Sequence, residues 1–103
     1  MLIKIFQTKS GKEPFIHWLE KIKDKNAQTR IRQRIRRLEE NNFGDFKPLG
    51  KNLYELRLDF GPGYRVYCAK GKENSEEIIF LLLGGSKGTQ EKDILKSRKI
   101  YND

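Results

Sequence analysis

The spacing of apolar residues predicts a helical first half and a strand-rich second half. Residues 2–7 alternate around Ile3 and Ile5, which is the spacing of a short strand. The segment 10–13 followed by Pro14 is typical of a capped helix start. We expect that helix to end near Asp24 and to bury one apolar face, made by Phe15, Trp18, Leu19 and Ile22.

A second helix is predicted directly afterwards. Its apolar stripe is Ala27, Ile31, Ile35 and Leu38, and arginines fill both flanks of that stripe. Residues 41–44 include Asn and Gly, which tolerate a left-handed backbone and therefore end the helix. The region around Pro48 and Gly50 is expected to be a loop. The two helices would form a helical hairpin.

From Leu53 the apolar period changes to two, which predicts a half-buried strand through Phe60. The sequence Gly61-Pro62-Gly63 predicts a turn, and the alternation resumes from Tyr64 to Ala69, so the two strands form an antiparallel hairpin. In that hairpin Arg57 and Arg65 are expected to share a face.

Residues 78–83 are apolar at every position, as in a strand covered on both faces. We expect Gly84-Gly85 to close that strand and residues 89–101 to form a last helix. The order strand, helix, helix, three strands, helix predicts one α+β domain over residues 1–103. Its helices would pack on one face of an antiparallel sheet and leave the other face open.

Charge and composition narrow the class of partner. Lys and Arg number 22 against 14 Asp and Glu, a net charge of +8 that attracts polyanions, with nucleic acid as the first candidate. An anionic membrane surface or an acidic protein would be attracted by the same field. One cysteine, Cys68, and one histidine, His17, predict neither a disulfide nor a metal site. We expect a soluble, cytoplasmic protein, because no apolar run is long enough to span a bilayer.

Three cations are predicted on the open face of the sheet: Arg57, Arg65 and Lys87, the last of them directly after Ser86. Arginine matches phosphate with two parallel N–H donors, and such a cluster stabilises the charge that develops at phosphorus during RNA cleavage. That reaction needs no metal, because the 2'-hydroxyl of the RNA is the nucleophile.

The sequence Leu53-Tyr54-Glu55-Leu56-Arg57, then Gly63-Tyr64-Arg65-Val66-Tyr67, then an apolar strand into Gly84-Gly85-Ser86-Lys87 resembles the RelE/ParE toxin superfamily. The resemblance is closest to its HigB-like branch of phage-derived addiction module killer proteins. It implies a microbial RNase-type fold of order β-α-α-β-β-β-α and a toxin of a type II toxin-antitoxin system. It also implies cleavage of translated mRNA on the ribosome and neutralisation by a cognate antitoxin, often of helix-turn-helix type, with no metal or small-molecule cofactor.

Carried over by position, the family's basic residues fall on Arg57, Arg65 and Lys87. The first basic hairpin position of the family is Glu55 here, and the tyrosine early in its last helix aligns near Asp93. The acid-base candidates are therefore Glu55, Tyr67 and Asp93, with Tyr101 as a further one. The candidate RNA-binding residues are Arg30, Arg34, Arg37, Lys47 and Tyr64.

Other interpretations stay open from the sequence. The hairpin arginines also fit a solvated sheet face with cross-strand ion pairs to Glu55 and Asp59, and the Arg-rich helix fits a plain solvated face. A ParE-like poison of DNA gyrase would need no nuclease residues. A non-catalytic basic module would bind only an acidic antitoxin segment, laid across the open sheet face.

Overall fold

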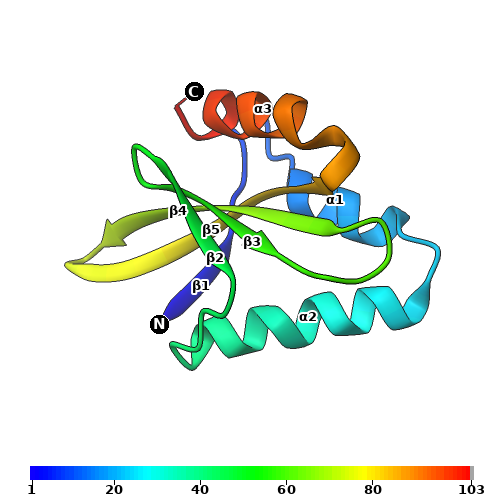
Figure 1. Ribbon diagram of the computed structural model, residues 1–103. Coiled ribbons are helices and arrows are strands. Elements are labelled where there is room, and N and C mark those ends of the chain that lie inside the picture. Colours follow the sequence, from blue (N-terminus) through cyan, green and yellow to red (C-terminus); the bar gives the residue numbers. More distant parts are fainter. Residues whose placement is uncertain (103) are drawn as a thin grey trace.

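A computed structural model describes residues 1–102, which form a five-stranded sheet with helices on both faces (Figure 1). The strands are β1 (Leu2–Ile5), β2 (Phe46–Gly50), β3 (Leu53–Arg57), β4 (Tyr64–Glu73) and β5 (Glu76–Ser86). The helices are α1 (Pro14–Lys21), α2 (Lys25–Glu39) and α3 (Gln90–Asn102), and a short 3-10 turn at Lys87–Thr89 leads into α3. The α+β class predicted from the sequence is confirmed. No helix within residues 1–102 has the length and apolar character needed to cross a membrane.

The boundary between the first two helices differs from the prediction. Helix α1 ends at Lys21, three residues before Asp24. Asp24 instead caps α2, because its Oδ1 accepts hydrogen bonds from the backbone N–H groups of Asn26 (2.9 Å) and Ala27 (3.3 Å). At the start of α1, Glu13 is the N-cap residue and its side chain makes no capping hydrogen bond, so the predicted cap does not form.

The sheet is mixed, whereas the sequence predicted an antiparallel one. Its strand order is β1-β5-β4-β3-β2, with β1 parallel to β5 and the other neighbours antiparallel. The region around Pro48, predicted as a loop, forms the edge strand β2 and pairs with β3. Proline is tolerated there because an edge strand leaves one row of backbone groups without a ladder partner, and the pairing is irregular between Pro48 and Gly50.

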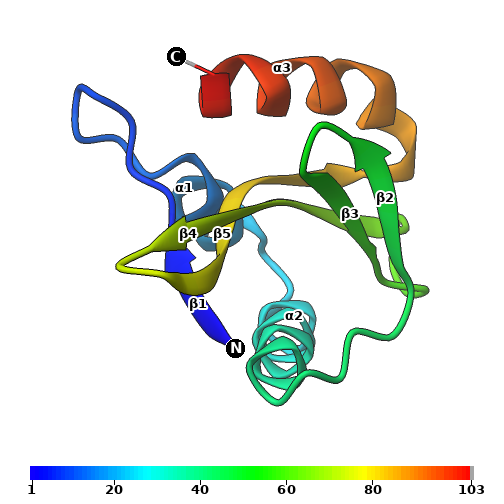
Figure 2. The ribbon, with the colours of Figure 1, turned by 90° about the vertical axis from the view of Figure 1, so that its left-hand side faces the viewer.

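Helices α1 and α2 pack on one face of the sheet, as predicted, and α3 lies on the opposite face (Figure 2). The core of the α1–α2 face is apolar, and its buried members are Phe15, Leu19, Ile31, Leu38, Leu56, Leu58, Val66, Cys68, Ile79 and Leu81.

The second face is not open, so that prediction is wrong. Helix α3 covers it and encloses a smaller core of buried residues made by Leu53, Tyr67, Ala69, Leu82 and Leu83. Ile94, Ile100 and Tyr101 of α3 pack against this core. The apolar run in β5 accounts for the cover, because a strand that is apolar on both sides loses stability unless both sides leave water.

Gly84 and Gly85 lie inside β5 and do not form the predicted turn. As successive residues of a strand, these two glycines face opposite sides of the sheet, and the register shift between Tyr67 and Cys68 determines which side each one faces. A β-carbon on Gly84 would lie 2.0 Å from the Trp18 ring of α1, and one on Gly85 would lie 1.9 Å from Asp93 of α3. Each glycine therefore admits one helix to close contact with the sheet.

Candidate functional site

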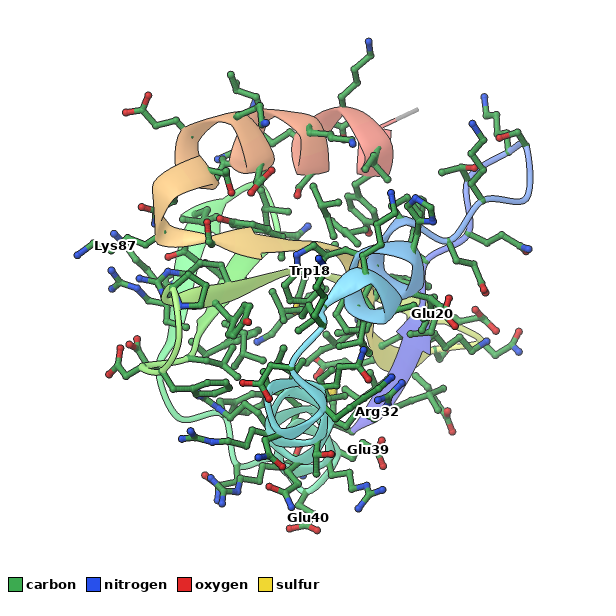
Figure 3. The ribbon with its side chains drawn as sticks, turned by 90° about the vertical axis from the view of Figure 1, so that its right-hand side faces the viewer. Trp18, Glu20, Arg32, Glu39, Glu40 and Lys87 are labelled. Atoms are coloured by element: carbon green, nitrogen blue, oxygen red, sulfur yellow. The ribbon has the colours of Figure 1, made fainter. Side chains whose placement is uncertain are left out.

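The three predicted cations meet at one end of the sheet. In the strand register Arg57 of β3 lies opposite Arg65 of β4, and Arg65 lies opposite Gly85 of β5, two residues before Lys87. The carbonyl of Gly63 accepts hydrogen bonds from the Lys87 backbone N–H (2.8 Å) and from Nη1 of Arg65 (3.1 Å). The Lys87 side chain extends outward from the molecule beside the start of α3 (Figure 3).

These cations differ in their access to solvent. Arg65 is 4% exposed, and its Nη1 donates to the carbonyls of Gly63 and Tyr64, each at 3.1 Å. The Arg57 side chain is 34% exposed, and Lys87 is exposed. Arg57 and Lys87 are therefore accessible from solvent, whereas Arg65 is buried.

Glu55 lies fully buried on β3, so this part of the sheet is not a solvated face. Its Oε1 lies 3.3 Å from Nε of Arg57, which forms the ion pair expected between these two residues. Its Oε2 accepts a hydrogen bond of 2.7 Å from Nε2 of Gln90, the first residue of α3. Sequence reasoning missed Gln90, since one polar residue at a helix start carries no signal of a contact 35 positions away.

Tyr67 lies directly opposite Glu55 on the neighbouring strand and is also fully buried. Burial raises the pKa of its hydroxyl strongly, and the nearby negative charges of Glu55 and Asp93 raise it further, while Arg65 partly offsets them. The hydroxyl is therefore protonated at neutral pH. It faces the Glu55 carboxylate but has no partner with hydrogen-bond geometry among residues 1–102.

Asp93 belongs to the same site but is already engaged. Its carboxylate accepts a short hydrogen bond from Oγ1 of Thr89 and packs against Gly85. Thr89 in turn accepts a hydrogen bond from the Ser86 backbone N–H at 3.2 Å. These contacts fasten the first turn of α3 to the end of β5. Tyr101, the further acid-base candidate, lies near the other end of α3, where its hydroxyl contacts the Lys70 carbonyl at 3.4 Å.

The candidate RNA-binding residues separate into two places. Lys47 of β2 lies opposite Glu55 in the register, so it is on the same face and is exposed. It joins Arg57, Arg65 and Lys87 as a fourth cation around the site. Arg30, Arg34 and Arg37 lie on α2, at the other face of the sheet.

On the α2 side, two of the arginines have structural contacts. Arg34 donates to the carbonyls of Arg57 (2.8 Å), Phe43 and Asp45 (both 3.3 Å), and burial lowers its pKa, partly offset by Asp45. The guanidinium of Arg30 stacks 3.8 Å from the centre of the Phe60 ring.

Tyr64 also lies away from the predicted site. It packs edge-to-face against Trp18 and Phe60 beside the core of the α1–α2 face. Neighbouring residues of a strand point to opposite faces, so Tyr64 points away from Arg65 and the other cations.

Metal-ligand groups and the free thiol complete the inventory of reactive side chains. Within residues 1–102 no cluster of three or more His, Cys, Asp or Glu side chains is arranged to hold a metal ion. Cys68 is buried in the core of the α1–α2 face, and burial raises the pKa of its thiol. Neither observation adds a group to the site described above.

Comparison with known proteins shows that the chain is similar in sequence to a bacterial protein. It is 44% identical over 89 residues to an uncharacterized protein of Haemophilus influenzae, an alignment that covers 86% of this chain and 87% of the relative. The chain belongs to the same family as that protein. No family model matches the chain, and no solved structure matches it. The relative's description names no activity, so the residues of the site are what bears on function.

Proposed function

We propose that this protein is the toxin of a type II toxin-antitoxin system, of the RelE/ParE type and its HigB-like branch, and that it cleaves mRNA. The observation that carries the proposal is a group of buried polar atoms on β3 and β4, on the same face as the partly exposed Arg57. Among residues 1–102, Glu55 Oε1, Arg65 Nε and Tyr67 OH are buried without a hydrogen-bond partner. Each such atom costs about 1–3 kcal/mol, so their concentration at neighbouring positions of β3 and β4 favours a site that binds a ligand.

The cations of this site suit a phosphodiester. Arg57 and Lys87 would meet the phosphate at the surface, and Arg65 would stabilise the negative charge that grows on its oxygens as the fifth bond to phosphorus forms. Lys47, exposed beside Glu55, would bind a neighbouring phosphate of the strand.

Glu55 and Tyr67 supply the proton transfers that the reaction needs. Because Glu55 is fully buried, the RNA would have to displace the partly exposed Arg57 side chain beside it. Glu55 would then accept the proton of the RNA 2'-hydroxyl while that oxygen attacks the adjacent phosphorus. The bond from phosphorus to the 5'-oxygen then breaks, and Tyr67, protonated at neutral pH, would give its proton to that oxygen. The products would be a 2',3'-cyclic phosphate and a 5'-hydroxyl. Asp93, already bonded to Thr89, would hold α3 in place and take no part in proton transfer.

The fold and charge support the rest of the assignment. In the RelE-like arrangement that we propose for the fold, the edge strand β2 would be one further strand that precedes the hairpin. The net charge of +8 suits an encounter with ribosomal RNA in the cytoplasm and neutralisation by an acidic segment of a cognate antitoxin.

Induction of the protein alone in a bacterial host, with 5' ends mapped across the transcriptome, tests this proposal. We expect growth arrest and new cleavage sites inside translated frames. Lys87→Ala should reduce cleavage by about 10²-fold, since it removes one charge-stabilising donor. Lys87 is preferred to Arg65 for this test because it is exposed, and Lys21→Ala on α1 is the matched control. Growth arrest with intact mRNA would point to a protein target such as DNA gyrase, and unimpeded growth to a non-catalytic binding module.

A further inference from the structure

We propose that Gln90 is a positioning residue that fixes the Glu55 carboxylate so that Oε1, and not Oε2, receives the proton of the RNA. This inference rests on the proposed function and adds to it a residue with no counterpart among the predicted site residues. It starts from the two oxygens of Glu55, which have different partners although the side chain as a whole is fully buried.

The Oε2 atom is occupied by a strong hydrogen bond. Nε2 of Gln90 donates to it at 2.7 Å. The Oε1 atom lies 3.3 Å from Nε of Arg57 and has no hydrogen-bond partner among residues 1–102. Rotation of the carboxylate would exchange the two oxygens, and the Gln90 bond opposes that rotation. Oε1 is therefore the oxygen whose lone pairs remain for a hydroxyl proton, and because it is buried the RNA must displace the partly exposed Arg57 side chain to reach it.

Gln90 is itself held in place from both sides. Its backbone begins α3, whose first turn is fastened to β5 by Thr89, through the Ser86 backbone N–H and the Asp93 carboxylate. Gly85 lets Asp93 approach the strand closely enough for this attachment. The amide side chain therefore spans from a fixed helix to β3. Groups held by rigid elements keep a reactive atom within the narrow limits that catalysis needs.

The chemistry of the donor also suits this role. An amide is neutral, so it orients the carboxylate without placing another positive charge beside it. A second cation at Oε2 would favour the charged form of the carboxylate and weaken its action as a base. The ion pair with Arg57 already places a positive charge against the carboxylate.

The test is a steady-state cleavage assay with purified protein and mRNA on purified ribosomes, measuring kcat and KM separately. Gln90→Leu keeps the size of the side chain and removes the donor, and should lower kcat about 10–100-fold with KM unchanged, as expected for a misplaced reacting group. Gln90→Glu should lower kcat further, because it places a second carboxylate against Oε2. The control is Gln7→Leu, the same substitution at an exposed position.

A double substitution separates positioning from a structural effect. In a Glu55→Gln background, Gln90→Leu should cause no further loss of kcat, because a residue that acts only through Glu55 has nothing left to position. Equal additional loss in that background, or a kcat loss matched by a lower melting temperature, would overturn the role. If the wild-type protein cleaves and Gln90→Leu retains full kcat, the role of Gln90 alone is wrong. If the wild-type protein does not cleave, the proposed function is wrong and this role is wrong with it.

Discussion

The two faces of the sheet differ in whether their buried polar side chains have hydrogen-bond partners. On the α1–α2 face the buried polar side chain is Gln28, and its Nε2 donates to the carbonyls of Leu19 (3.1 Å) and Ile22 (2.7 Å) at the end of α1. On the α3 face the buried polar and charged side chains are Glu55, Arg65, Asp93 and Ser97. Within residues 1–102, all the buried side-chain atoms without a partner belong to that second face: Glu55 Oε1, Arg65 Nε, Tyr67 OH and Ser97 Oγ.

This difference indicates a division of labour within one small domain. The α1–α2 face buries apolar side chains with its polar group satisfied, and such a face contributes stability. The α3 face keeps polar atoms that a purely structural core would have replaced or paired. Sites that violate the packing rules locally are expected to be functional, with stability supplied elsewhere in the molecule.

The largest expected difference in the free energy of unfolding is between substitutions at two adjacent residues of β3. Leu56 and Glu55 are both fully buried, on opposite faces. Leu56→Ala should lower the free energy of unfolding by about 2–5 kcal/mol, because it leaves a cavity in the larger core. Glu55→Gln should change it by less than about 1 kcal/mol, since it keeps an acceptor for Gln90 and removes a buried charge whose partner Arg57 reaches water. Urea unfolding of both variants measures the contrast, and comparable losses would contradict the division of labour.

The sequence contained part of the evidence for this division. The order of the helices, the β3–β4 hairpin and the shared face of Arg57 and Arg65 follow from local periodicity, and the structure confirms them. The apolar run 78–83 also predicted cover on both faces of β5. That prediction contradicted the open face inferred from the order of the elements. The thin apolar pattern of α3 concealed which element provides the cover, since α3 buries Asp93 and Ser97 beside its apolar residues.

The contacts that complete the site are not local and leave no periodic signal. Lys47 reaches the site because the residues around Pro48 form an edge strand. The sequence did not suggest this strand, since Pro48 and Gly50 are typical of a loop. Gln90 reaches Glu55 across the sheet face. Gly84 and Gly85 resemble a turn in the sequence, and only the pairing of β5 with β4 places them inside a strand.

Substitution of Gly84 or Gly85 disturbs one face of the sheet at a time, and so tests the difference between the two faces. Gly84→Ala places a methyl group against Trp18, and Gly85→Ala places one against the Asp93 carboxylate. Each should lower the free energy of unfolding by about 1–3 kcal/mol, because a well-packed contact must open. Only Gly85→Ala should also impair the proposed RNA cleavage, since it shifts the first turn of α3 and with it Gln90. The measurements are urea unfolding and the ribosome cleavage assay, and equal activity of the two variants would contradict the assignment of the site to the α3 face.

The smallest expected effect concerns Tyr67 and appears only in alkaline solution. Because the pKa of Tyr67 is higher in the folded protein than its ordinary value, the folded state binds more protons than the unfolded state once pH passes about 10. The free energy of unfolding of the wild-type protein should therefore fall as pH rises above about 10. Tyr67→Phe removes this titration, so the wild-type protein should lose stability relative to the variant as pH rises. Cys68, whose pKa is also raised by burial, contributes a similar alkaline loss to both proteins, and it cancels in their difference. Urea unfolding across the alkaline range measures that difference, and a constant value would mean that Tyr67 ionises in the folded protein as readily as in water. Such a result would place its hydroxyl in contact with solvent and remove the distinction between the two faces at this residue.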